Sequence, residues 1–230
     1  MRSPMRSPSA PRTMDYEAIK STIERYRAEG KKLFATSSFQ THSIPMLHLL
    51  SRIDRDIDIA FINTGYHFPE TVRFRDDVAE LLGLRLVDVR SQVPRNLQRD
   101  SNRQLYFTSD PDTCCYLNKT QPLEPLLIEY DVWINGIRAD QSAHRRSMAV
   151  EQRAPHGALR FHPMLDWTSK MIFDYIREFQ LPRHPLEDAG YLSIGCEPCT
   201  RKIDLDNDRS GRWFGLHKTE CGLHTDLVER

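Results

Sequence analysis

Residues 58–69, DIAFINTGYHFP, decide the fold of this chain. The first half of the stretch, Asp58 to Asn63, is almost entirely apolar, which is the pattern of a strand buried on both faces of a parallel sheet. A polar loop follows, and a helix is predicted from Pro69 because proline is favoured in the first helical turn. Phe74 and Val78 then recur at helical spacing. The stretch therefore predicts a strand, a polar loop and a helix in succession.

The same alternation of strands and helices extends on both sides of this stretch. The expected elements are a helix at 15–29, a strand ending at 36, a helix at 44–53, strands at 85–89 and 131–136, and a helix at 169–179. Such alternation predicts an α/β domain with a twisted parallel sheet and helices on both of its faces. Ligands of these sheets bind at the carboxyl ends of the strands, so functional loops are expected at 37–43, 63–69 and 136–142.

Both ends of the chain differ from this regular middle. Residues 1–14 are rich in Ser, Pro and Arg and contain no acidic residue, which predicts a disordered leader. A transit peptide has a similar composition but is usually longer. We expect residues 15–205 to form the α/β domain and residues 206–230 to form a flexible C-terminal segment.

The composition limits the classes of protein to which the chain can belong. It has 230 residues, of which 39% are hydrophobic and 28% charged, as in a globular protein. Lys and Arg total 32, as do Asp and Glu, so the basic excess of a nucleic-acid-binding protein is absent. No apolar run approaches the roughly 20 residues of a transmembrane helix. The chain has five cysteines and no secretory segment, so we expect a cytoplasmic protein without a disulfide framework.

The spacing of the cysteines predicts a metal site. Cys114 and Cys115 are adjacent, Cys196 and Cys199 are separated by two residues, and all of them fall in stretches that we expect to be irregular. Two close pairs of thiolates are typical of a metal centre. An adjacent pair is awkward for a zinc knuckle, whereas an iron–sulfur cubane offers four separate iron corners. The spacing therefore favours an iron–sulfur cluster, with loop thiols and a C-x-x-C redox pair as the alternative.

The fifth cysteine, Cys221, has no partner in this spacing. It lies close to Lys218 and His224, and cationic neighbours lower the pKa of a thiol. A thiolate at this position would be a nucleophile. A terminal cysteine without a role is an equally good interpretation of the composition alone.

Five separated motifs link these residues to a known family. They are NTGYxFPET at 63–71, CCxxxK at 114–119, GIRxDQS at 136–142, GCxPC at 195–199 and ECGLH at 220–224. In these residues and in this order the chain resembles the iron–sulfur adenylyl-sulfate (APS) reductases of assimilatory sulfate reduction, which are relatives of the 3′-phosphoadenylyl-sulfate (PAPS) reductases. The resemblance extends from about residue 33 to residue 224 and implies the fold of the adenosine-nucleotide α-hydrolases.

The resemblance implies a nucleotide site on the predicted loops. Residues 37–43 occupy the position of the Ser-Gly-Gly-x-Asp-Ser loop with which relatives bind pyrophosphate. Here the loop reads SSFQTHS, and the missing glycines and acidic residue suit a protein that holds a sulfated nucleotide rather than cleaving ATP. The implied substrate-binding residues on these loops are Ser37, Ser38, Gln40, Thr41, Asn63, Gly65 and Arg138.

The resemblance also implies roles for the cysteines and for several basic residues. The implied ligands of a [4Fe–4S] cluster are Cys114, Cys115, Cys196 and Cys199. Lys119 would lie between the cluster and the substrate, where a cation can pair with both. The implied phosphosulfate-binding residues near the C-terminus are Arg209, Arg212 and His224. The chain departs from the family at Asn118, where many relatives have a second basic residue.

These roles describe a reductase that works through a covalent intermediate. The thiolate of Cys221 would attack the sulfur of APS and expel AMP, leaving an S-sulfonated cysteine. A thiol of thioredoxin or glutaredoxin would then release sulfite. Reduction of PAPS, or of both nucleotides, is the nearest alternative, and a zinc-stabilised nucleotide-binding module without redox activity is the second. The sequence leaves the formation of a homo-oligomer open.

Overall fold

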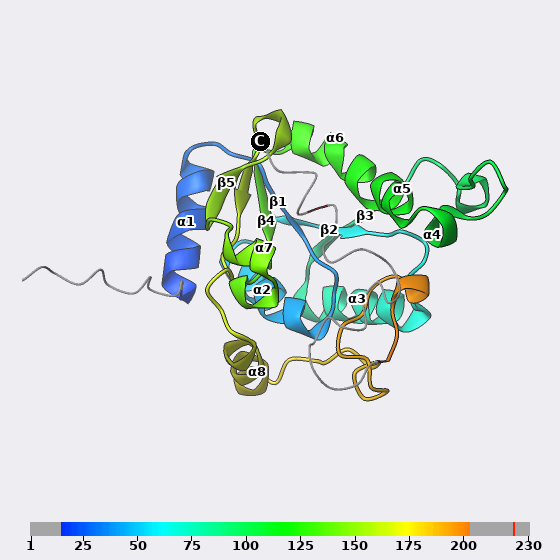
Figure 1. Ribbon diagram of the computed structural model, residues 1–230. Helices are drawn as coiled ribbons and strands as arrows, with labels where there is room; N and C mark the ends of the chain where they lie inside the picture. Colours follow the sequence, from blue (N-terminus) through cyan, green and yellow to red (C-terminus); the bar gives the residue numbers. More distant parts are fainter. Residues whose placement is uncertain (1–14, 203–222, 224–230) are drawn as a thin grey trace, which may run out of the picture.

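The computed structural model describes residues 15–202 and Leu223 (Figure 1). Its centre is a six-stranded sheet in the order β3-β2-β1-β4-β6-β5. The strands are β1 (Leu33–Thr36), β2 (Asp58–Ile62), β3 (Arg85–Val89), β4 (Val132–Asn135), β5 (Glu151–Arg153) and β6 (Leu159–Phe161). All of them run parallel except β5, which pairs antiparallel with β6 at one edge. The predicted α/β sheet is confirmed, with two further strands that the sequence pattern does not predict: the parallel strand β6 and the antiparallel edge strand β5.

Helices cover both faces of the sheet, as predicted. The longer helices are α1 (Tyr16–Ala28), α2 (Ile44–Ile53), α3 (Pro69–Leu82), α6 (Gln121–Glu129) and α8 (Ser169–Glu178). The short helices and helical turns are η1 (Thr41–Ser43), η2 (Arg95–Leu97), α4 (Tyr106–Ser109), α5 (Pro111–Cys115), η3 (Tyr116–Thr120), η4 (Ala139–Gln141), α7 (Ala143–Arg146), η5 (Pro155–Gly157) and η6 (Glu197–Cys199). Helices α1, α2, α3 and α8 lie on one face of the sheet, and α6 lies on the other (Figure 1).

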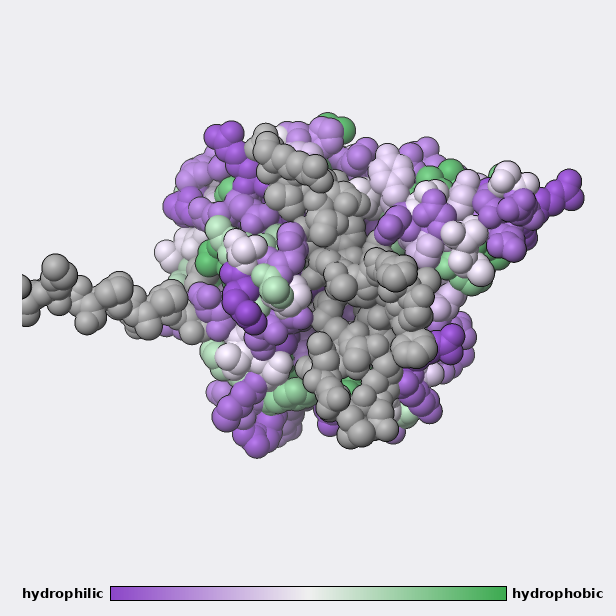
Figure 2. All heavy atoms as spheres, in the orientation of Figure 1, coloured by the Kyte–Doolittle hydropathy of each residue, from purple (hydrophilic) through white to green (hydrophobic). Residues whose placement is uncertain are grey.

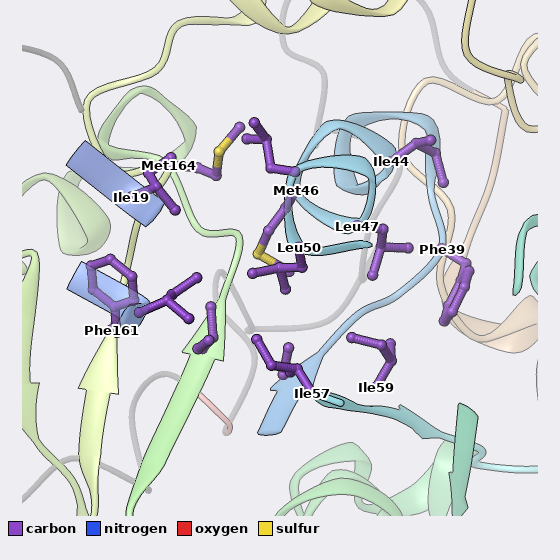
Figure 3. Packing of buried hydrophobic residues seen from close by; sticks show 14 of the residues in the cluster. Ile19, Phe39, Ile44, Met46, Leu47, Leu50, Ile57, Ile59, Phe161 and Met164 are labelled. Atoms are coloured by element: carbon purple, nitrogen blue, oxygen red, sulfur yellow. The ribbon is translucent and has the colours of Figure 1, made fainter. Parts of the chain in front are cut away.

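Alternating side chains along the strands build two hydrophobic clusters. In β1, Leu33 and Ala35 face the larger cluster, whereas Phe34 faces the smaller cluster beside α6. In the larger cluster, Met46 and Leu50 of α2 point toward the sheet (Figure 3). Burial on both faces explains why the central strands are apolar at nearly every position.

The cysteine pair next to α6 is helical. The prediction that Cys114 and Cys115 lie in an irregular stretch is wrong, because both belong to the last turn of α5. The side chain of Asp110 caps this helix by accepting a hydrogen bond from the backbone N–H of Thr113, and Pro111 is its first residue. These capping residues fold five residues into a helix that is too short to show any apolar periodicity.

The predicted leader, residues 1–14, and the predicted flexible segment, residues 206–230, lie outside the described residues except for Leu223. Leu223 packs against the smaller cluster beside α6. Among the described residues, no helix has the length and apolar composition needed to cross a membrane. The described residues on the face shown in Figure 2 are mostly hydrophilic, with hydrophobic ones scattered among them.

Candidate active site

A cavity of about 290 Å³ lies at the carboxyl ends of β1, β2 and β4. The last residues of these strands, Thr36, Ile62 and Asn135, border it, and so do the loops that follow them. The three loops predicted to be functional therefore meet at one place. They do so because parallel strands bring their carboxyl ends to the same edge of the sheet.

The loop after β1 presents hydroxyl and amide groups to this cavity. Ser37, Ser38 and Gln40 all line it. Gln40 donates a hydrogen bond to Ser38 Oγ at 3.3 Å and accepts one from Ile194 N–H at 2.9 Å. The glutamine thus connects this loop to the segment that carries Cys196.

Two other residues of the same loop fix its shape. Phe39 has a φ of 52°, which is unusual for a residue other than glycine, and its buried ring packs edge-on against Phe61. Thr41 is fully buried, and its hydroxyl accepts a hydrogen bond from His184 N–H at 2.9 Å. Of the residues predicted on this loop, Thr41 therefore lies behind the cavity wall rather than in it.

The loop after β2 is held together by its own side chains. Asn63 accepts a hydrogen bond from Gly65 N–H at 3.1 Å and donates one to Asp88 at 3.2 Å. Gly65 has a φ of +71°, which glycine adopts without strain. Asn63 and Gly65 shape the loop and do not border the cavity itself. Between them, Thr64 places its hydroxyl 3.3 Å from Cys196 Sγ, so this loop reaches the cysteines.

Arg138 places a fixed positive charge in the wall of the cavity. Its side chain is only 2% exposed. Its Nε lies 3.0 Å from Asp140 Oδ1, its Nη2 donates to Ser169 Oγ at 2.9 Å, and its Nη1 lies 3.2 Å from His42 Nδ1. A guanidinium keeps its charge at all ordinary pH values. These three contacts fix the direction of the Arg138 side chain before any anion binds.

A second buried arginine, Arg145, lines the same cavity and does not follow from the motifs. It lies on α7, and its backbone N–H donates to the side chain of the N-cap residue Ser142. Its guanidinium also donates a hydrogen bond to Gln141. The signal in the sequence is its position one helical turn after the GIRxDQS motif, because residues three apart on a helix lie on the same side.

The four cysteines predicted as cluster ligands line a second, narrow cavity. Cys114, Cys115 and Cys196 are buried, Cys199 is half-buried, and none of the four forms a disulfide. Burial, and after it the negative charge that the other three thiols can carry, raises the pKa of Cys114 to about 12 against an opposing effect of Lys119. The thiols are therefore close enough to act on one another electrostatically.

The two cavities share part of their walls. Lys119 and Cys196 line both of them. An ammonium group at this position can attract a thiolate on one side and an anionic ligand on the other. Lys119 thus lies between the cysteines and the loops at the strand ends, and its role toward a cluster and a substrate stays a prediction.

The chemistry of these donors suits an iron–sulfur cubane better than a single ion. Among residues 15–202 and Leu223, no three His, Cys, Asp or Glu side chains converge on one point as the ligands of a single metal ion do. A [4Fe–4S] cluster takes one thiolate at each of four irons, so its ligands stand farther apart. A buried thiol with a raised pKa, such as Cys114, stays protonated on its own, and coordination to a cation removes its proton. Four thiols around one cavity supply this donor set.

The remaining predicted site residues lie outside the described residues. They are Arg209, Arg212, Cys221 and His224. Leu223, which separates the last two, lines the larger cavity.

Comparisons with known proteins identify the family of this chain. Residues 32–202 match the phosphoadenosine phosphosulfate reductase domain. The chain belongs to this family. An adenosine 5′-phosphosulfate reductase of Chelativorans sp. is 38% identical over 92% of this chain and 86% of its own length. A phosphoadenosine 5′-phosphosulfate reductase of Gloeobacter violaceus is 39% identical over 87% of this chain and 86% of its own length.

Solved structures share the fold of this family member. A phosphoadenylyl-sulfate reductase from Candida auris, in a phosphate complex, has a TM-score of 0.64 at 21% identity and covers 77% of this chain and 87% of its own. An FMN adenylyltransferase from Candida glabrata has a TM-score of 0.60 at 13% identity, over 94% of this chain and 73% of its own. The same architecture thus carries different reactions, and the side chains of the site must distinguish them.

Proposed function

We propose that this chain reduces adenylyl sulfate to sulfite and AMP with electrons from a thiol, as a step of sulfate assimilation. The observation that carries the proposal is the shared wall of Lys119 and Cys196, which joins a four-thiol cavity to the cavity at the strand ends. Curated relatives named adenosine 5′-phosphosulfate reductase, such as that of Chelativorans sp., support the substrate.

The proposed cofactor is a [4Fe–4S] cluster. Its ligands would be Cys114, Cys115, Cys196 and Cys199, the four cysteines of the narrow cavity. When bound, the cluster supplies structural order and an electrostatic field beside the substrate. The family resemblance connects these cysteines with APS rather than PAPS, because the enzymes specific for PAPS lack them.

The larger cavity would hold the nucleotide and its phosphosulfate group. Ser37, Ser38 and Gln40 offer hydrogen-bond donors, and Arg138 and Lys119 offer positive charge. Asn63, Gly65 and Thr41 do not border the cavity and would contribute by holding the loops in shape. Arg209, Arg212 and His224 would complete the anion site from the C-terminal segment. Each preorganised cation in such a site contributes about 2–4 kcal/mol to stabilisation of the transition state.

The reaction would proceed in two transfers at sulfur. The Cys221 thiolate attacks the sulfur of APS, forms an S–S bond and breaks the bond from sulfur to the phosphate oxygen. AMP leaves with the electron pair of that bond, and Cys221 becomes S-sulfocysteine. The position of Leu223 at the cavity supports this assignment, because two residues of chain span at most about 7 Å.

The second transfer would need a dithiol protein of the thioredoxin or glutaredoxin class. One of its thiolates attacks Sγ of the sulfonated Cys221, and sulfite leaves with the electron pair of the S–S bond. The mixed disulfide is then resolved by the partner's second thiol, which regenerates the Cys221 thiol. Overall, the partner loses two electrons and the sulfur of APS gains them.

Anaerobic sulfite release tests this function directly. We expect sulfite from APS with a thioredoxin system, a lower kcat/KM with PAPS, and no sulfite from the Cys221→Ser variant of the same iron content. Faster turnover of PAPS than of APS would select PAPS as the substrate. The relative from Gloeobacter violaceus is named a phosphoadenosine 5′-phosphosulfate reductase, which supports this alternative. Zinc without iron or acid-labile sulfide, together with no sulfite from either nucleotide, would select the non-redox module.

A further inference from the structure

Asn118 and Gln98 form a buried pair of amides behind the cysteines. Asn118 is only 2% exposed and Gln98 only 1% exposed. Gln98 Nε2 donates to Asn118 Oδ1 at 2.9 Å, and Asn118 Nδ2 donates to Gln98 Oε1 at 2.6 Å. Each amide thus supplies the partners that the other needs in order to be buried. Asn118 is also the position at which the chain departs from the basic residue of its relatives.

The surroundings fix the direction in which each amide points. The carbonyl oxygen of Val93 lies 2.8 Å from Gln98 Nε2, and the carbonyl oxygen of Cys114 lies 2.9 Å from Asn118 Nδ2. Carbonyl oxygens only accept hydrogen bonds, so both contacts require the amide nitrogen. Rotating the Asn118 amide by 180° would bring its oxygen against the Cys114 carbonyl. One N–H of Asn118 therefore faces Cys114, and the other faces Gln98 Oε1.

The same nitrogen reaches the thiol of Cys114. Asn118 Nδ2 lies 3.7 Å from Cys114 Sγ, within hydrogen-bond range for sulfur. A buried thiolate is costly without such donors. We propose that Asn118, locked by Gln98, is a positioning residue that donates to the Cys114 ligand and stabilises the bound cluster. The proposal rests on the [4Fe–4S] cofactor proposed above.

The donor has two expected effects on the cluster. A hydrogen bond to a ligand sulfur withdraws negative charge, which favours the reduced state and raises the reduction potential. It also orients the ligand and slows the loss of iron. A neutral amide achieves both without adding the charge that a second basic residue would place next to Lys119.

The test measures the reconstituted full-length protein and three variants. Asn118→Leu keeps the side-chain volume and removes the donor. We expect a more negative reduction potential and a transfer of iron to a chelator about 10-fold faster, because loss of such a partner weakens metal binding about 10- to 100-fold. Gln98→Leu leaves Asn118 unlocked and should shift both quantities in the same direction by less. Asn96→Leu, at an exposed position two residues from Gln98, is the matched control and should change neither.

The outcomes separate this inference from the cofactor on which it rests. Wild-type values of potential and iron release in both Asn118→Leu and Gln98→Leu would overturn the positioning role. If Asn118→Leu does not fold, Gln98→Leu decides by the same two measurements. A role in packing alone predicts an unchanged potential in Asn118→Leu, because leucine fills the same space. A wild-type protein that takes up no cluster would instead overturn the cofactor, and this role with it.

Discussion

Lys119 lies between the four cysteines and the cavity at the strand ends. Its ammonium group opposes the rise in the pKa of Cys114, and its side chain borders both cavities. A single charge can therefore stabilise a thiolate ligand and the phosphosulfate of a substrate. Because Lys119 borders both cavities, a substitution there tests the proposed link between the cysteines and the substrate.

Replacing Lys119 by glutamine should lower kcat/KM for sulfite release about 30- to 1,000-fold. That range corresponds to the loss of about 2–4 kcal/mol of transition-state stabilisation from one preorganised donor. Steady-state kinetics at matched iron content would measure it. Lys170→Gln is the control, because the Lys170 side chain is 84% exposed on α8 and should leave kcat/KM unchanged. Equal kinetics for the Lys119→Gln variant and the wild type would contradict the role of the shared wall.

Single residues were predictable where their chemistry was distinctive. The four cysteines stood out because few other roles require two close thiol pairs, and Lys119 stood out as a cation four residues after the first pair. Thr41 shows the opposite case: a hydroxyl can face a ligand or, as here, a backbone N–H of His184, and sequence does not distinguish the two. Arg145 was missed because an arginine on a short helix is ordinarily a surface residue.

At the scale of elements, the loop after β2 depends on the backbone of Gly65. Its φ of +71° is rare for other residues, and a Cβ there would lie 3.0 Å from Arg95 Cδ. The same loop places Thr64 beside Cys196. A change of its backbone conformation should therefore disturb the site as well as the loop.

Gly65→Ala should destabilise the fold by about 1–2 kcal/mol, the usual cost of a left-handed alanine, and should raise KM for APS several-fold. Gly83→Ala is a matched control, because Gly83 has a φ of +62°, ends α3 and has open space around it. It should show a similar loss of stability in urea unfolding and an unchanged KM. An equal change of KM for APS in both variants would contradict a specific role of the loop after β2 in substrate binding.

Elements were predictable where burial imposes a pattern. The apolar residues of β2 and the helical repeat after Pro69 follow directly from a sheet covered on both faces. The hairpin of β5 and β6 carries no such pattern, because each strand has three residues and Glu151–Arg153 is polar throughout. In β6, Arg160 is fully buried with its guanidinium 4.3 Å from the centre of the Trp133 ring, so a charge occupies a position where an apolar residue is expected.

For the molecule as a whole, His162 connects stability with pH. It is fully buried after β6, and its Nδ1 lies 2.7 Å from the carbonyl oxygen of Ala149, which can only accept a hydrogen bond and so requires a proton on Nδ1. Burial, together with the charge of Arg160, lowers the pKa of His162 to about 4. The unfolded chain, with a pKa near 6.5, therefore binds more protons than the folded one between these two values.

The free energy of unfolding should consequently fall as the pH drops from about 6.5 toward 4. The contribution that the neutral His162 makes to it should be fully present above pH 6.5. Integration of the linkage relation gives about 2 kcal/mol between pH 7 and pH 5 for this one group. Urea unfolding at the two pH values would measure the difference. His162→Gln, which does not titrate, should reduce this pH dependence, whereas an identical dependence in the variant would exclude His162 as its source.

The central claim for the whole molecule is that a chain with this fold and these cavities captures the sulfonate of APS covalently. The most direct measurement is the intact mass of the anaerobically prepared, reduced protein after incubation with APS and no added thiol. We predict a gain of one sulfonate group that maps to Cys221 and disappears when reduced thioredoxin is added. A cluster-loaded protein that gains no sulfonate from APS or from PAPS would contradict the account.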